Sequence, residues 1–251
     1  MFAHRGGSAL GPENTLAAFD RGLQARADGV ELDVQFSADG VVVVHHDPTL
    51  DRTTSATGLL AARTADDLAR VDAGWHFAAG ADHPFRGQGI GVPTLREVLR
   101  RYPDVPVIIE MKVDSAEMGE AVAREVRLAG AVDRVCAAGY GARSAAAARA
   151  ALPEMACSAS HREARLAVYR ALLRWPVRHT RYGGYQIPEE YGRLRLVSPR
   201  FIRYAHDAGM KVQVWTVDEE SDMRRLLGWG ADGLISNRPD LAVRVRNACC
   251  P

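Results

Sequence analysis

The stretch Gly29-Val30-Glu31-Leu32-Asp33-Val34-Gln35 reads as a buried β-strand with charge on one of its sides. Glu31 and Asp33 are two residues apart, so both lie on one face of a strand and Leu32 lies on the other. An unpaired carboxylate inside a sheet is costly. Two carboxylates on one face therefore indicate a site at the end of this strand rather than ordinary core.

Similar short apolar segments alternate with amphipathic segments along the whole chain. The predicted strands, rich in Val and Ile and bounded by Gly, Pro or Asp, are residues 1–5, 29–35, 106–112, 133–138, 155–158, 183–187, 211–217 and 232–236. The predicted helices are residues 13–27, 94–102, 116–129, 141–151, 161–173, 199–208, 219–228 and 239–247. Eight strand–helix units in about 250 residues predict a (β/α)8 barrel. A doubly wound open sheet is the alternative.

One segment interrupts the alternation. Residues 41–46 predict an extension that pairs with the second strand, and residues 50–92 then form a long insertion. A loop of this length in a compact domain usually serves as a cap or a substrate-binding excursion. We therefore expect residues 1–251 to form one barrel domain with 50–92 inserted in it.

The composition excludes several functional classes. Lys and Arg total 32 against 31 Asp and Glu, which gives a net charge of +1 and predicts no nucleic-acid partner. The chain has no apolar run of about 18 residues and no helix that is an obvious membrane-lying amphipath, so we expect no stable membrane insertion. The chain has four cysteines, Cys136, Cys157, Cys249 and Cys250. They have neither metal-ligand spacing nor a disulfide pattern, which favours a reducing, cytoplasmic location. The oligomeric state is open.

In a parallel barrel the active site lies at the carboxyl ends of the strands. The first predicted strand ends at His4-Arg5, and the extension ends at His45-His46-Asp47. The third predicted strand ends at Glu110 and Lys112, which are again two residues apart. Ionisable side chains therefore gather at the ends of successive strands.

Three converging carboxylates (Glu31, Asp33 and Glu110) suggest an oxygen-ligand site for Mg²⁺ or Ca²⁺. Three negative charges in one pocket repel one another and raise one another's pKa values unless a cation neutralises them. Strand-end salt bridges with Arg5 and Lys112 are the structural alternative.

Two histidines beside such a cluster favour a catalytic site. An imidazole acts as a base when neutral and as an acid when charged. Arg5 and Lys112 offer donors to an anion. A cation, two fixed positive side chains and an acid–base pair are together the groups that catalyse phosphodiester cleavage.

These residues resemble the glycerophosphodiester phosphodiesterase family, and the matching runs follow the family's order over nearly the whole chain. The runs are His4-Arg5-Gly6, Pro12-Glu13-Asn14-Thr15, Gly29-Val30-Glu31-Leu32-Asp33-Val34, Val44-His45-His46-Asp47-Pro48, Leu50-Asp51-Arg52-Thr53-Thr54, Pro93-Thr94-Leu95, Ile109-Glu110-Met111-Lys112, Val214-Trp215-Thr216-Val217, Gly230-Ala231-Asp232-Gly233 and Asn237-Arg238-Pro239. A lone His-Arg-Gly would carry no weight, but the ordered set is specific.

The resemblance implies a TIM barrel in which residues 50–92 are the family's insertion. It implies one divalent cation, Mg²⁺ or Ca²⁺, held by Glu31, Asp33 and Glu110, with His4 and His46 as the catalytic acid and base.

It also implies four residues around the substrate. Arg5 and Lys112 would bind phosphate oxygens, Trp215 would wall the alcohol side of the pocket, and Glu13 would orient the site through hydrogen bonds.

The chain departs from the family pattern at two positions. His45 stands where an apolar residue usually precedes the second catalytic histidine, so the role is carried to His46, the histidine followed by Asp-Pro. Neighbouring strand residues face opposite ways, so we expect His45 to point away from His46. Asn237 stands where an Asp is common, which removes a charge.

The sequence thus predicts metal-dependent hydrolysis of glycerophosphodiesters to glycerol 3-phosphate and an alcohol, with a small-molecule substrate as the partner. A lysophospholipase D or another phosphodiesterase on the same barrel is the nearest alternative. A non-catalytic metal-binding barrel is the more distant one. The choice of metal, the assignment of acid and base, and the nucleophile (water or a substrate hydroxyl) are open.

Overall fold

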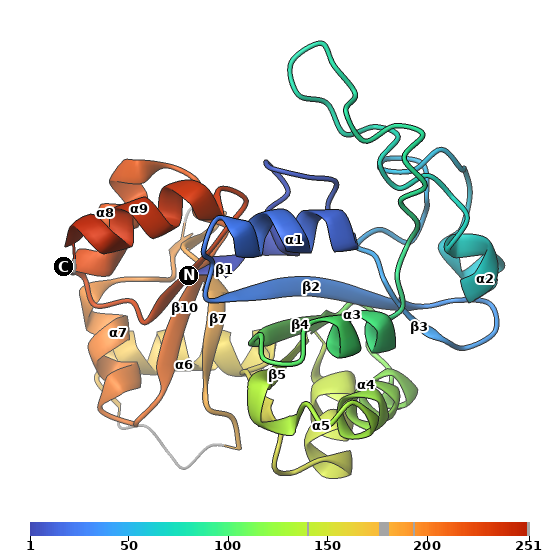
Figure 1. Ribbon diagram of the computed structural model, residues 1–251. Helices are drawn as coiled ribbons and strands as arrows, with labels where there is room; N and C mark the ends of the chain where they lie inside the picture. The colour runs from blue at the N-terminus through green and yellow to red at the C-terminus, as the bar shows by residue number, and fades with distance from the viewer. Residues whose placement is uncertain (140, 176–180, 193, 250–251) are drawn as a thin grey trace.

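Eight parallel strands form a barrel (Figure 1). The computed structural model describes residues 1–139, 141–175, 181–192 and 194–249. Around the barrel the strands follow the order β6 (Ala156–Cys157), β5 (Val135–Gly139), β4 (Val107–Met111), β2 (Gly29–Phe36), β1 (Phe2–Ala3), β11 (Gly233–Ser236), β10 (Lys211–Trp215) and β7 (Gly184–Pro188). The ring closes between β6 and β7, where Ser158 bridges Gly184 and the Ala159 N–H donates to the Gly184 carbonyl at 2.9 Å. The predicted barrel is confirmed, and the open-sheet alternative is wrong.

Helices cover the outside of the barrel, and each predicted helix is present (Figure 1). They are α1 (Leu16–Gln24), α3 (Leu95–Arg101), α4 (Ala116–Leu128), α5 (Ala142–Ala151), α6 (His161–Leu173), α7 (Pro199–His206), α8 (Glu220–Gly228) and α9 (Pro239–Cys249). Local signals fix several of their ends. Thr94 and Glu97 form a capping box at the start of α3, and Pro199 and Pro239 occupy the first positions of α7 and α9. No helix in the described part is long and apolar enough to cross a membrane.

The alternation of β2 divides its side chains between two environments. Val30, Leu32 and Val34 belong to a buried cluster that includes Phe19 of α1 and Met118 of α4. The intervening carboxylates point the other way, toward the barrel interior, because successive strand residues face opposite sides. Burial of the apolar face therefore fixes where the acidic face must lie.

The first strand is shorter than predicted. β1 spans only Phe2–Ala3, and His4–Gly6 form a single 3-10 turn, η1. Arg5 and Gly6 have φ values of 51° and 87°, in the left-handed region, which ends the strand. A Cβ at Gly6 would lie 2.7 Å from the Phe19 ring, so glycine is required where this turn packs on α1.

The insertion begins from a small additional strand. β3 (Val42–Val44) runs antiparallel to β2, so the predicted extension is confirmed over three residues. Residues 50–92 contain η2 (Leu60–Ala62) and α2 (Ala65–Leu68) and have a small apolar cluster of their own with Leu50, Leu60 and Leu68. The tip of the insertion extends away from the barrel (Figure 1). Two expectations remain predictions: that the insertion acts as a cap, and that residues 1–251 form one domain.

Two further elements were not predicted. β8 (Glu190–Tyr191) and β9 (Leu194–Arg195) form a small antiparallel pair after β7. A short 3-10 turn, η3 (Val132–Arg134), occupies the start of the fourth predicted strand, and β5 begins after it. Cys250 lies outside the described residues.

We predict that Gly22→Ala in α1 destabilises the protein by about 1–3 kcal/mol. An exposed helix glycine replaced by alanine normally gains up to about 1 kcal/mol. At Gly22, however, a Cβ would lie 2.5 Å from the Gly6 carbonyl oxygen and 2.8 Å from the Ala3 Cβ, so the η1 turn must shift. Urea unfolding measures the change.

The matched control is Gly228→Ala in α8, where a Cβ would meet nothing within 4 Å. This variant should be neutral or more stable. Equal effects of the two substitutions would contradict the packing argument.

Candidate active site

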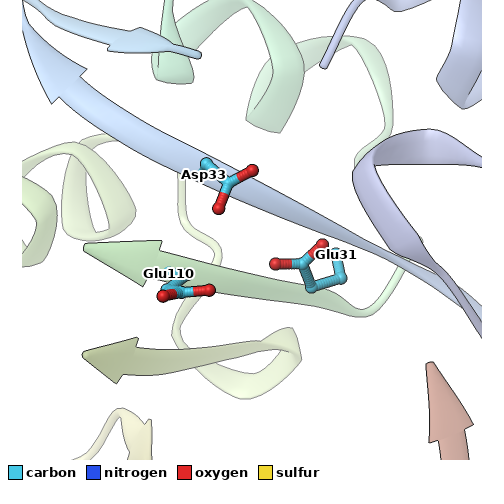
Figure 2. Close-up of side chains that lie close together, drawn as sticks. All are labelled: Glu31, Asp33 and Glu110. Atoms are coloured by element: carbon cyan, nitrogen blue, oxygen red, sulfur yellow. The ribbon is translucent and has the colours of Figure 1, made fainter. Parts of the chain in front are cut away.

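Three carboxylates from two adjacent strands point toward one another at one end of the barrel (Figure 2). Glu31 and Asp33 come from β2 and Glu110 from β4, and the register of these strands pairs Asp33 with Glu110. One oxygen of each side chain lies within 4.8 Å of an oxygen of the others. Glu31 and Asp33 are buried, and Glu110 is partly exposed. The group could hold a metal ion.

The three charges oppose one another strongly. Burial, followed by the negative charges of Asp33 and Glu110, raises the pKa of Glu31 well above its ordinary value. Burial would also raise the pKa of Asp33, but the positive charges of Lys112 and Arg5 outweigh it and hold that pKa low. The Lys112 ammonium lies 3.0 Å from oxygens of both Asp33 and Glu110. The cluster thus depends on neighbouring cations.

Backbone and amide donors fix the orientation of the two carboxylates on β2. The Arg5 N–H donates to Glu31 Oε2 at 3.0 Å, a bond that the left-handed turn at Arg5 makes possible. Asn14, also at positive φ, donates from Nδ2 to Asp33 Oδ2 at 2.8 Å and accepts from the Asp33 N–H at 3.2 Å. Asn14 belongs to the run Pro12-Glu13-Asn14-Thr15, but the sequence alone does not predict its contact with Asp33.

His4 is held through one ring nitrogen by Asn237. The two side chains are joined by a hydrogen bond of 2.6 Å between His4 Nδ1 and Asn237 Oδ1, while Asn237 Nδ2 donates to Asp218 at 2.7 Å. Because the amide nitrogen is committed to Asp218, Oδ1 is left to accept from the His4 N–H. His4 Nε2 then lies on the other side of the ring, 3.9 Å from Glu31 Oε2. Burial lowers the pKa of His4, which favours the neutral ring.

His46 follows β3 and is anchored in the same manner by an acid. Its Nδ1 donates to Asp47 Oδ1 at 2.6 Å, and Gln35 Nε2 holds its carbonyl at 2.9 Å. Asp47 also accepts from Arg52, which shares Glu13 with Arg5, so hydrogen bonds link His46 to the acidic cluster. The preceding His45 is buried, with Nε2 3.2 Å from the Thr49 carbonyl, so it makes a separate structural contact.

Arg52, from the root of the insertion, connects the two parts of the site. Its guanidinium donates to both Glu13 oxygens at 2.7 and 2.8 Å and also to Asp47. Arg5 donates to the same Glu13 carboxylate at 2.9 Å. Burial would raise the pKa values of Glu13 and Asp47, but Arg52 lowers each to about 2.

Acidic side chains outnumber permanently charged basic ones in this site. Five carboxyl groups (Glu13, Glu31, Asp33, Asp47 and Glu110) lie among three basic side chains (Arg5, Arg52 and Lys112). A divalent cation would offset this excess and would favour the ionised form of Glu31. Carboxylate oxygens without sulfur or nitrogen ligands suit Mg²⁺ or Ca²⁺. The donor set and its charge therefore fit the metal that the sequence predicted.

Trp215 lies elsewhere on the same end of the barrel. It ends β10, packs partly against Ile108, Ala138 and Ile235, and borders a cavity of about 430 Å³. The cavity lies between the ends of β7 and β10, the β8–β9 pair and α8, and its lining residues are Pro188, Glu189, Glu190, Arg195, Trp215, Thr216, Asp222 and Arg225. The carboxylates of the acidic cluster are not among them.

The structure therefore brings the predicted site residues together with one exception. His4, Arg5, Glu13, Glu31, Asp33, His46, Glu110 and Lys112 form one connected cluster. Trp215 is three strands from β2 around the barrel and approaches the cluster only across the barrel interior, where it packs against Ile108 of β4.

The supporting roles of Asn14, Arg52, Asn237 and Asp218 were missed. Arg52 and Glu13 are 39 residues apart, and Asn237 and His4 are 233 apart. The one signal in the sequence was membership of the runs that match the family, which include Asn14, Arg52 and Asn237.

Comparison with known proteins agrees with this geometry. The sequence profile described as "Glycerophosphoryl diester phosphodiesterase family" matches residues 4–241. The chain belongs to this family. The prediction from the sequence is thereby confirmed at the level of the family.

Individual members match over nearly the full chain. A glycerophosphodiester phosphodiesterase of Caldanaerobacter subterraneus is 30% identical over 98% of this chain and 96% of its own. The crystal structure of the Agrobacterium tumefaciens glycerophosphodiester phosphodiesterase is 30% identical with a TM-score of 0.78, covering 97% of this chain and 98% of that chain. An Oleispira antarctica phosphodiesterase, solved with the product sn-glycerol-3-phosphate, is 26% identical with a TM-score of 0.79, covering 98% and 96%.

We predict that Arg52→Gln lowers the free energy of unfolding by about 1–2 kcal/mol at pH 7, a value that allows for solvent screening of a half-exposed arginine. Glu13 and Asp47 have lower pKa values in the folded protein than in the unfolded chain, where a carboxyl group has a pKa of about 4. Their ionised forms therefore stabilise the folded state at pH values above about 4. This stabilisation is lost as the pH falls through about 2. The difference between wild type and variant should therefore shrink as urea unfolding is repeated from pH 7 toward pH 2.5.

Arg70→Gln is the control, because Arg70 lies in the same insertion, is well exposed and pairs with Asp67. It should change stability by less than about 0.5 kcal/mol. A pH-independent loss at Arg52 would contradict the electrostatic account.

Proposed function

We propose that this protein hydrolyses glycerophosphodiesters to sn-glycerol 3-phosphate and an alcohol with the help of one divalent cation. The convergence of three carboxylates with His4 and His46 at one end of the barrel supports this proposal most strongly. A related phosphodiesterase that holds sn-glycerol-3-phosphate as product adds support for the product class.

Glu31, Asp33 and Glu110 would hold the cation. A divalent ion bound there supplies Lewis-acid polarisation of a phosphoryl oxygen and neutralises charge on it. Arg5 and Lys112 touch the same carboxylates, so their positive groups are available to the non-bridging oxygens of a phosphodiester at this position.

His4 acts as the general base in this proposal. Its buried ring has a lowered pKa and is neutral near pH 7, and the bond from Nδ1 to Asn237 leaves the lone pair on Nε2. This nitrogen faces the acidic cluster and takes a proton from the attacking oxygen, which belongs to water or to a neighbouring hydroxyl of the substrate. Asn237 and Asp218 act as positioning residues through His4.

His46 acts as the general acid and donates a proton to the leaving alkoxide. The ionised Asp47 carboxylate at Nδ1 stabilises the charged imidazolium that this role requires. Arg52 and Glu13 hold Asp47 and Arg5 in place. Trp215, which borders the cavity between β7 and β10, walls the alcohol side.

We predict that EDTA abolishes turnover of glycerophosphocholine and that Mg²⁺ or Ca²⁺ restores it. Glu110→Gln removes a ligand charge and should weaken the metal affinity by about tenfold or more, which calorimetric titration of the metal-free protein measures directly. Glu120→Gln, at an exposed position of α4, is the matched control. Full activity after chelation would refute metal dependence.

We predict that His4→Ala and His46→Ala each reduce kcat by about 10²-fold or more. His76→Ala, at an exposed histidine of the insertion, should leave kcat unchanged. The same assays with lysophosphatidylcholine test the substrate class, and a preference for the lysolipid would favour the lysophospholipase D alternative. If either variant keeps activity within a few-fold of wild type, that histidine has no part in proton transfer.

A further inference from the structure

Helix α6 (His161–Leu173) exposes large apolar side chains that the proposed reaction does not use. Nine large apolar residues are well exposed in the described part of the chain, and five of them lie within residues 166–175. Their side chains are between 48% and 60% exposed: Leu166, Tyr169, Leu172, Leu173 and Trp175. We call these five residues the α6 patch. Scattered exposed apolar residues are normal, but a contiguous set marks an interaction surface.

The packing of α6 explains why these residues face outward. The face turned to the barrel consists of Ala164, Ala167, Val168 and Ala171, all buried. Leu166, Tyr169 and Leu173 recur at spacings of three and four residues on the opposite side of the helix. Small residues allow α6 to lie close to the strands, and the large ones belong to none of the buried apolar clusters that the described residues form.

The charge around the α6 patch is positive. Arg162 and Arg165 are exposed on the same helix, and Arg170 and Arg174 follow at its end. The one acidic residue of 161–175 is Glu163, which is paired with Arg149 at 3.0 Å. This segment therefore carries 4 − 1 = +3, against +1 for the whole chain.

We propose that the α6 patch docks on the surface of a phospholipid bilayer that contains anionic lipids. Leucine, tyrosine and tryptophan side chains framed by arginines are the composition of a helix that lies in the plane of a membrane interface. The apolar residues enter the boundary between headgroups and acyl chains, and the arginines meet the negative surface potential. The helix has 13 residues, which suits surface binding and not a membrane span.

Charge argues against a second copy of this chain as the occupant. A two-fold contact of the patch with itself would bring two +3 segments together, and like charges across an interface are unfavourable. An anionic membrane surface supplies the opposite charge over its whole area.

The position of α6 relates this contact to the open end of the barrel. Its first residue, His161, has its ring centroid 5.6 Å from that of Tyr191, an exposed aromatic residue of β8. The neighbouring Glu190 and Arg195 line the cavity beside Trp215. The α6 patch begins further along the helix, which runs back toward the amino ends of the strands, so docking through it leaves the open end of the barrel and its chemistry in water.

Vesicle flotation tests the proposal directly. The protein of residues 1–251 should float with vesicles of phosphatidylcholine and phosphatidylglycerol, bind at least tenfold more weakly to phosphatidylcholine alone, and detach at high salt. The double variant L166S/L173S and the double variant R162Q/R165Q should each weaken the partition coefficient by about tenfold or more. Turnover of soluble glycerophosphocholine should stay at the wild-type level, which shows that the variants fold and separates this proposal from the proposed function.

The matched control is L128S/R124Q on α4. Arg124 and Leu128 are exposed and lie four residues apart outside the patch, as Arg162 and Leu166 do on α6. It should float like wild type. The proposal is overturned if wild type fails to bind anionic vesicles or if the α6 variants bind as tightly as wild type. It is also overturned if sedimentation shows a wild-type dimer that L166S/L173S converts to a monomer, because a second copy then covers the patch.

Discussion

The mutual repulsion of three carboxylates is the constraint around which this end of the barrel is arranged. Glu31, Asp33 and Glu110 lie within 4.8 Å of one another, two of them buried. Such a group is tolerated only where cations and hydrogen-bond donors surround it. Lys112 and Arg5 provide the charge, and Asn14 and the Arg5 backbone provide the donors.

The same constraint reaches outward to both histidines. Arg5 touches the acidic cluster and Glu13, Glu13 shares Arg52 with Asp47, and Asp47 holds His46. On the other side His4 is fixed by Asn237, which is itself held by Asp218. Each histidine is anchored through Nδ1, so Nε2 is the nitrogen left for chemistry. The substitution of Asn for the family's common Asp at 237 keeps this anchor, because its amide oxygen still accepts a hydrogen bond.

The sequence predicted the barrel and the acidic cluster because both follow from local patterns. Alternation within residues 29–35 put Glu31 and Asp33 on one face, and parallel pairing of β2 with β4 brings Glu110 opposite Asp33. The turn at His4–Gly6 escaped prediction because a left-handed arginine has no signal of its own beyond the glycines that follow it. Arg52 and Asn237 escaped because their contacts span long sequence separations, which periodicity does not encode.

The exposed face of α6 escaped for a different reason. Both sides of this helix are apolar in sequence, and large side chains are normally assigned to the core. Here alanines fill the inner face, and leucines, a tyrosine and a tryptophan lie outside. Only the packed structure distinguishes the two sides.

The central claim is that the three carboxylates hold one ion beside the two histidines. Anomalous diffraction from crystals grown with Mn²⁺, which takes the same oxygen ligands as Mg²⁺, measures the position of that ion directly. The account predicts a single strong peak about 2.0–2.6 Å from oxygens of Glu31, Asp33 and Glu110. Absence of a peak there at saturating Mn²⁺, with Lys112 still bridging Asp33 and Glu110, would contradict it.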